Sequence, residues 1–144
     1  MIGFAASIIA GGVMSLQGVL NTGLSDKIGL YESNAFVQGT AFVFSILAML
    51  IFGKGSFSAI RDVNLIYLTG GLLGVIITIT VMLGISKLSP TTAISVILVS
   101  QLLCGALIDA FGLFGSEKIS FNLRNYIGIA LMISGIIVFK LANR

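Results

Sequence analysis

The sequence predicts an all-α membrane protein with five transmembrane helices. Hydrophobic residues make up 57% of the chain and charged residues only 9%. The mean hydropathy of +1.13 does not suit a water-exposed surface. The apolar residues occur in five runs, each long enough to cross a bilayer as a helix at about 1.5 Å per residue. The predicted spans form one transmembrane domain, 1–144, and cover about 2–22, 33–52, 65–86, 90–114 and 123–141.

Composition and charge exclude several classes of protein. The net charge is +3, but the basic residues are scattered singly, without the cluster that a nucleic-acid partner requires. Cys104 is the only cysteine, and there is no histidine, the commonest metal ligand and general base. The sequence holds no nucleophile and base pair, metal cluster or phosphate loop. We therefore expect no enzyme activity, no catalytic residue, no metal site and no cofactor.

The first predicted span, about 2–22, ends near Gly23 and is small or polar on one side. Small residues recur at every fourth position, which permits close contact with another helix; they are Gly3, Ser7, Gly11 and Ser15. Gln17 and Asn21 lie further along, four residues apart and therefore on one face of a helix. A short polar linker, Ser25 to Glu32, is expected to follow.

The second and third predicted spans also carry polar or small residues among apolar ones. The second, about 33–52, stops at Gly53, a favoured residue just past a helix end. Its small and polar residues fall on a narrow stripe at about 100° per residue; they are Asn34, Gln38, Ala41 and Ser45. The third, about 65–86, contains Gly70 and Gly74, a GxxxG pair that suits helix packing.

The fourth predicted span, about 90–114, begins with a specific start signal. Ser is favoured at the cap before a helix and Pro at its first position, so Ser89–Pro90 marks the start. Gln101, Gly105 and Asp109 share one stripe of this helix. Gln101 falls about mid-helix, and Gly105 leaves room for a ligand or a neighbouring backbone.

Asp109 is the only acidic residue within a predicted span. A carboxylate at mid-membrane costs about 3 kcal/mol on insertion scales, so its presence indicates a function. Two interpretations remain open. Either Asp109 lines a polar groove together with Gln101, or it lies among lipid headgroups and orients the end of the helix. In the first case Asp109 is the best candidate for proton coupling.

The fifth predicted span, about 123–141, is the least polar of the five. Its small residues suit helix contacts; they are Gly128, Ala130, Ser134 and Gly135. Tyrosines fall near the ends of several spans, where interfacial anchors are expected; they are Tyr31, Tyr67 and Tyr126.

Four amide side chains on the first two predicted spans allow two roles; they are Gln17, Asn21, Asn34 and Gln38. Amides in a bilayer need hydrogen-bond partners, and bonds between helices worth about 0.6 kcal/mol are an ordinary packing device. The other interpretation is that these amides, with Gln101, line a cavity and contact a substrate. We take cavity lining as the hypothesis and packing as the alternative.

The basic residues give no net orientation. Five spans put the termini on opposite sides, so the positive-inside rule can be applied by counting. The N-terminal side holds four basic residues, Lys54, Arg61, Lys118 and Arg124, and the other side holds four, Lys27, Lys87, Lys140 and Arg144. This balance predicts dual topology, in which copies insert both ways. The alternative is that a miscounted loop, the terminal amine or a partner decides the orientation.

The chain has no visible internal repeat. Transporters commonly place a substrate site near the midplane between two inverted halves. Here the second half would be another chain. We therefore expect an antiparallel homodimer, or a heterodimer with a related chain, within the lipid bilayer.

Several segments resemble one known family. The chain resembles the YdcZ-like inner-membrane exporters of the drug/metabolite transporter superfamily in two places. One is Ser100–Leu103 followed by Leu107–Gly115, and the other is Leu16–Asn21, which contains a Gln-x-x-x-Asn pattern. Three other segments also fit the family pattern; they are Gly39-Thr40, Gly70-Gly71-Leu72-Leu73-Gly74 and Gly128 to Lys140. The resemblance therefore covers essentially the whole chain.

The resemblance implies a five-helix half-transporter unit in the bacterial inner membrane, which the family uses as a single or paired unit. Two positions depart from the family pattern, Ser100 where it usually has Gly and Ala110 where it often has His. Because that His is missing, no proton-carrying role is assigned to position 110. The small multidrug exporters are similar in size. Their carboxylate-driven proton exchange is not carried over, because the first span has no glutamate.

We therefore predict a transporter subunit that exports a small metabolite or amphiphile by alternating access, with substrate contacts from Gln17, Asn21, Gln38 and Gln101. A second hypothesis is a non-transporting assembly or regulatory partner whose small-residue faces dock on another membrane protein. A third is a lipid-carrier flippase, for which the sparse basic residues offer no phosphate site.

Overall fold

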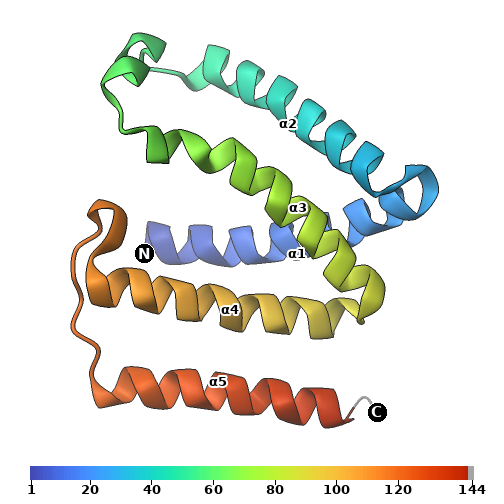
Figure 1. Ribbon diagram of the computed structural model, residues 1–144, viewed down its shortest axis with the longest axis vertical. Coiled ribbons are helices and arrows are strands. Elements are labelled where there is room, and N and C mark those ends of the chain that lie inside the picture. The colour runs from blue at the N-terminus through green and yellow to red at the C-terminus, as the bar shows by residue number, and fades with distance from the viewer. Residues whose placement is uncertain (143–144) are drawn as a thin grey trace. The chain divides into compact units, whose positions relative to one another are not determined.

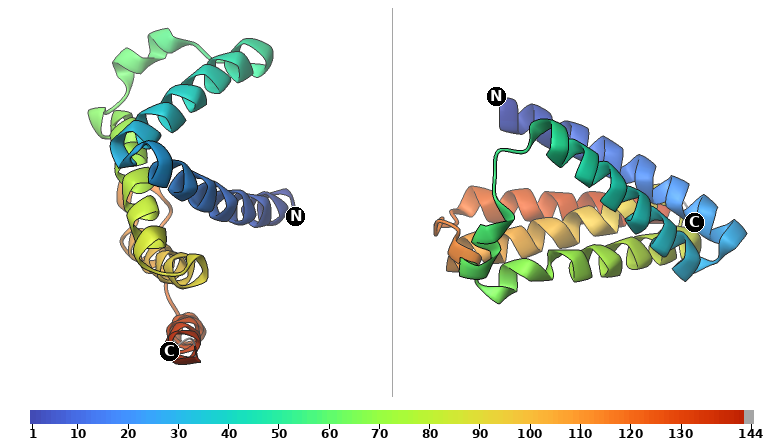
Figure 2. Two further views of the ribbon diagram at one scale, coloured as in Figure 1. Left: turned by 90° about the vertical axis from the view of Figure 1, so that its right-hand side faces the viewer. Right: turned by 90° about the horizontal axis from the view of Figure 1, so that it is seen from above.

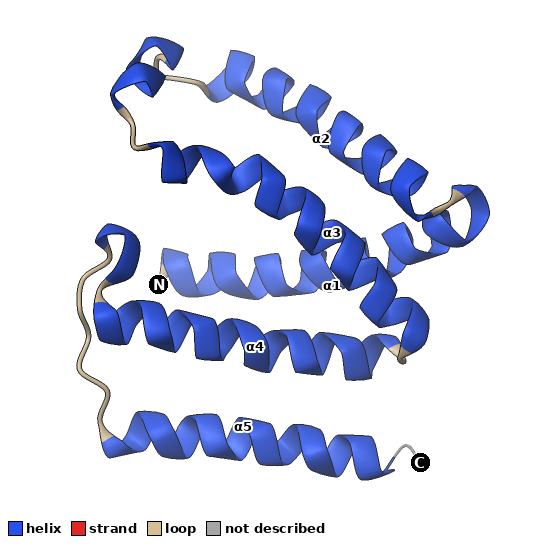
Figure 3. Ribbon diagram, in the orientation of Figure 1, coloured by secondary structure: helices blue, strands red, loops and turns tan. Residues whose placement is uncertain are grey.

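Helices account for nearly all of the structure. The computed structural model describes residues 1–142, and this range contains no β-strand (Figure 3). The α-helices are α1 (Ile2–Ile28), α2 (Leu30–Phe52), α3 (Gly70–Lys87), α4 (Pro90–Phe111) and α5 (Leu123–Ala142) (Figure 1). Short 3-10 helices join some of them; these are η1 (Phe57–Asp62), η2 (Leu65–Thr69) and η3 (Leu113–Gly115).

Within residues 1–142, five helices are long and apolar enough to cross a membrane, which confirms the predicted fold class. Three of these segments coincide with α1, α2 and α4, the fifth is Leu123–Leu141, and the third, Leu65–Lys87, includes η2 ahead of α3. Their apolar side chains are mostly exposed on the isolated chain. Such surfaces are stable in contact with lipid or another membrane protein, because neither requires apolar atoms to face water.

The helix ends agree with local sequence chemistry at several points. The hydroxyl of Ser89 accepts a hydrogen bond of 3.3 Å from the amide of Thr92, and Pro90 is the first residue of α4, which confirms the predicted start. α2 ends before Gly53, also as predicted. α4 ends at Phe111, short of the predicted 114, because Gly112 adopts a left-handed conformation (φ 64°) that an α-helix does not continue.

The connection between α1 and α2 differs from the prediction. The expected polar linker, Ser25 to Glu32, is helical except at Gly29. This residue has φ 103°, a value that glycine tolerates far better than other residues, and it alone separates the two helices. Polar residues such as Asp26 and Lys27 lower helix propensity only slightly. The conformation of Gly29, not the polarity of its neighbours, therefore ends α1.

The chain divides into two compact units, Met1–Lys87 and Leu88–Arg144. In the first unit, packing is concentrated near the Gly29 turn. The residues buried there come from all three helices; they are Gly18, Thr22, Ser33, Asn34, Met82 and Ile85. Residues 1–14 of α1 and 41–52 of α2 are exposed, and the two helices diverge from their turn (Figure 2). In the second unit, α4 packs against α5.

α1 and α3 lie close together at Gly18. A β-carbon at this position would lie 2.9 Å from Cδ1 of Ile85 and 3.1 Å from Cγ1 of Val81. A side chain here would force Ile85 and Val81 to shift, so the glycine allows the two helices to pack closely.

Replacing Gly18 with leucine is expected to destabilise the first unit by about 1–3 kcal/mol, because the added atoms overpack the contact with α3. The free energy of unfolding can be measured by denaturant titration in detergent micelles, followed by circular dichroism. Gly23→Leu is the matched control, since Gly23 is exposed in the same helix and a β-carbon there meets nothing within 4 Å. Both variants share the gain in helix propensity, so their difference reports the contact. Equal stabilities would contradict the role of Gly18.

Candidate functional site

Polar side chains from three helices meet in the first unit, and we refer to them as the polar cluster. Its members are Asn21 and Thr22 of α1, Ser33, Asn34 and Gln38 of α2, and Thr78 of α3. The members on α1 and α2 lie near the Gly29 turn, and Thr78 lies near the middle of α3. None of them carries a charge, so the chemistry available here is hydrogen bonding.

Ser33 connects the three helices. Its side chain is fully buried. The hydroxyl oxygen lies 3.3 Å from the backbone oxygen of Asn21 in α1 and 3.7 Å from the sulfur of Met82 in α3. Both of these atoms are acceptors, so the hydroxyl is the donor in each contact. Ser33 therefore fixes the register of α2 against both neighbours at the buried end of the cluster.

Gln38 forms a second link, between α2 and α3. Its Nε2 donates a hydrogen bond of 3.3 Å to the hydroxyl of Thr78, which in turn donates 2.9 Å to the backbone oxygen of Gly74. A β-carbon at Gly74 would lie 3.6 Å from Nε2 of Gln38, an ordinary van der Waals distance. The Gln38 amide therefore lies directly against α3 at Gly74.

Asn34 is the member of the cluster with an unmet hydrogen-bonding requirement. The residue is 7% exposed, and its Oδ1 is buried with no hydrogen-bond donor from the described residues. A buried acceptor left in this state costs about 1–3 kcal/mol. The three helices therefore pack around an amide oxygen that they do not themselves satisfy.

The structure brings together three of the four amides predicted on the first two spans. Asn34 is buried, and Asn21 and Gln38 are half-buried in the same cluster. Gln17 lies one helical turn from Asn21 and is exposed. The exposure of the four amide side chains thus increases from Asn34, through Asn21 and Gln38, to Gln17. Their contact with a substrate stays a prediction.

The two polar residues predicted on the fourth span lie in the second unit. Gln101 is exposed on α4, and Asp109 is half-buried in its last turns. The backbone oxygen of Asp109 accepts a hydrogen bond of 2.9 Å from the amide of Ile119, so the connection to α5 folds back onto this end of the helix. A hollow of about 250 Å³ between α4 and α5 includes neither residue; it is lined by Ser95, Leu98, Val99, Met132, Gly135, Ile136 and Phe139.

The predicted packing glycines behave differently from one another. Gly74 contacts another helix, as described above. A β-carbon at Gly11, Gly70 or Gly105 would meet nothing within 4 Å. Packing at those three positions stays a prediction.

Three residues that hold the cluster together were not predicted from the sequence. Ser33 and Thr78 are ordinary hydroxyl residues in apolar runs, and Gly18 was not singled out among the many glycines. One signal was available, because Gly18 and Thr22 are four apart and form the same small-xxx-small spacing as Gly70 and Gly74.

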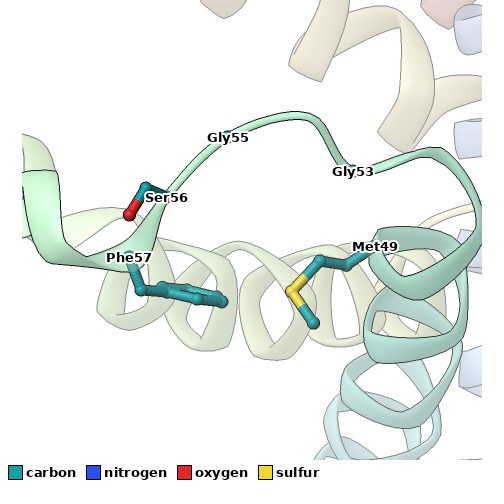
Figure 4. A pocket seen from close by; sticks show the side chains of 5 residues that line it. All are labelled: Met49, Gly53, Gly55, Ser56 and Phe57. Atoms are coloured by element: carbon teal, nitrogen blue, oxygen red, sulfur yellow. The ribbon is translucent and has the colours of Figure 1, made fainter.

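Two further hollows lie on α2 or at its end. One, of about 460 Å³, is bordered by Met49, Phe57 and the connection between them (Figure 4). The other is a notch of about 330 Å³ along one face of α2, around Gly39 and Thr40. Neither contains a predicted site residue. Within residues 1–142, no three His, Cys, Asp or Glu side chains gather into a group that could hold a metal ion.

Within residues 1–142, five helices are long and apolar enough to cross a membrane, and three of them, α1, α2 and α3, pack around an uncharged polar cluster. These features define a multi-pass membrane protein. The family model described as "Putative inner membrane exporter, YdcZ" matches residues 2–138. The chain therefore belongs to this family, as the sequence resemblance predicted, and is an inner-membrane protein. Family membership indicates transport rather than catalysis. No curated protein and no solved structure matches the chain.

Proposed function

We propose that the protein is an inner-membrane transporter subunit that exports a small metabolite or amphiphile, and that it acts as an antiparallel dimer by alternating access. The observation that carries this proposal is the polar cluster, set among helices that are otherwise apolar, in a chain of an exporter family. Polar residues within membrane helices commonly mark the path of a substrate.

In this proposal the substrate moves from the most exposed amide to the most buried one. Gln17 is the outer contact, Asn21 and Gln38 lie further in, and Asn34 is the innermost. Gln101, exposed on α4, is proposed as a further contact.

A second, inverted copy of the chain supplies the second half of the transporter. The polar residues of α1 and α2 lie toward the ends of these helices that meet at Gly29, so an inverted copy would present the same residues from the opposite face of the membrane. Two inverted halves that rock around one fixed site between them are the common architecture for alternating access. The open space beside Gly11, Gly70 and Gly105 also supports helix contacts with another chain.

Export can be tested by comparing the metabolites in the medium of cells that overproduce the wild-type protein with those of cells carrying an empty vector. We expect at least one compound to accumulate only with the protein. Gln17→Leu should lower its export about fivefold, the effect of one lost hydrogen bond, without changing the amount of folded protein. Because Gln17 is exposed, the substitution does not disturb packing. Identical media would instead favour a non-transporting assembly partner, a role that the same unoccupied glycines would also suit.

Asp109 is proposed as the proton carrier for this export. Asp109→Asn keeps the shape of the side chain but removes its titration, so export should become independent of an imposed pH gradient while membrane insertion is unchanged. The measurement uses proteoliposomes loaded with pyranine, in which internal pH is followed after addition of the exported compound. Glu117→Asn, outside the helices on the connection to α5, is the control. Unaltered proton movement with Asp109→Asn would exclude this role.

Dual topology predicts that C-terminal fusions report both sides of the membrane. Alkaline phosphatase is active only outside the cytoplasm and green fluorescent protein only inside it. Both fusions should be active at comparable levels, because equal numbers of basic residues flank the two faces. Adding two lysines after Gly53 should make one fusion dominant. Activity of a single fusion in the unmodified protein would show one fixed orientation.

A further inference from the structure

We propose that Asn34 recognises an uncharged hydrogen-bond donor on the substrate, an N–H or O–H group. This inference rests on the proposed transport function and deepens it by naming the chemical class of the substrate. The observation behind it is the buried Oδ1 of Asn34, which accepts no hydrogen bond from the described residues.

The hydroxyl donors of the cluster are committed to other atoms. The Thr22 hydroxyl donates to the backbone oxygen of Gly18 at 2.8 Å, and the Ser33 hydroxyl donates to the backbone oxygen of Asn21 at 3.3 Å. On α3, the Thr78 hydroxyl donates to the backbone oxygen of Gly74, and it also receives the hydrogen bond from Gln38. The Oδ1 of Asn34 is thus left without a donor, which a complementary ligand would bring.

The surroundings of Asn34 favour an uncharged donor. The buried polar residues of the first unit, Thr22, Ser33 and Asn34, carry no charge, and the buried apolar residues beside them on α3 are Met82 and Ile85. A cation placed here would lose its hydration without gaining a carboxylate partner. An amide or hydroxyl group loses less on leaving water and regains a hydrogen bond at Asn34. A methionine side chain beside it adapts readily to ligands of different shape.

The fold also gives such a ligand a direction of approach. Asn34 lies at the packed end of the unit, and beyond Gln38 the rest of α2, residues 41–52, is exposed. A substrate entering between the diverging parts of α1 and α2 would meet Gln17 and Gln38 first and Asn34 last. Asn34 is therefore placed to form a hydrogen bond with the polar group of the substrate that enters first.

Three benzene derivatives of similar shape test the proposal on the full-length protein in lipid nanodiscs. Benzamide carries N–H donors, N,N-dimethylbenzamide has none, and benzamidinium has donors and a positive charge. Ligand-detected NMR gives the affinity of each. We expect benzamide to bind at least about fivefold more tightly than either of the others, as one hydrogen bond predicts. Equal affinities, tighter binding of benzamidinium, or no binding of benzamide would overturn the proposal.

Asn34→Leu provides the second readout. Removing an unsatisfied acceptor in favour of an apolar group of similar volume should leave the melting temperature of the ligand-free protein unchanged or raise it, while the preference for benzamide is lost. A lower melting temperature would mean that a bound water or lipid already satisfies Asn34, and would overturn the proposal. Asn125→Leu, in α5 of the other unit, is the matched control and should keep the preference.

The two proposals can fail separately. Export without any preference for donors would remove the role of Asn34 but leave the transporter intact. Donor-selective binding without export would support the site and contradict the transport function.

Discussion

The structure depends on one constraint, that polar groups within a bilayer must find partners inside the protein. Hydroxyl side chains meet it locally, by donating to the backbone oxygen one turn earlier; Ser7, Ser15, Thr80 and Ser134 all do so. Such bonds require no second helix. Amide side chains are longer and carry both donors and an acceptor, so they need partners on other helices. Three of the four amides of α1 and α2, Asn21, Asn34 and Gln38, lie where α1, α2 and α3 meet.

Much of the fold could be predicted from the sequence, because helix length and helix ends depend on nearby residues. A long apolar run forms a membrane helix wherever it occurs, and Ser89–Pro90 and Gly53 act through their own backbone chemistry. The Gly29 turn was not predicted, because the surrounding polar residues suggested a loop. Polarity alone does not interrupt a helix, whereas a single glycine with positive φ does.

The candidate site could be predicted only in part. Amides stand out in an apolar chain, so Asn21, Asn34 and Gln38 were identified from sequence alone. The hydrogen-bond partner of Gln38, Thr78, was not identified, because this contact joins residues far apart along the chain. The contact of the neighbouring Ser33 with Met82 was not predicted for the same reason. Which amide remains unsatisfied likewise depends on where the neighbouring donors point. A single sequence carries no information about that arrangement.

The uncharged character of the cluster is consistent with a site that opens and closes. An ion pair within the membrane is costly to separate, because each charge is left without a partner in a medium of low dielectric constant. Hydrogen bonds between membrane helices are worth only about 0.6 kcal/mol each, since the separated groups find other partners. Contacts such as Gln38 with Thr78 can therefore be exchanged for contacts with a substrate at little cost. The close packing at Gly18 and Ser33 meanwhile holds the helices together at the Gly29 end, so the movement that the proposed transport requires would take place in their diverging parts.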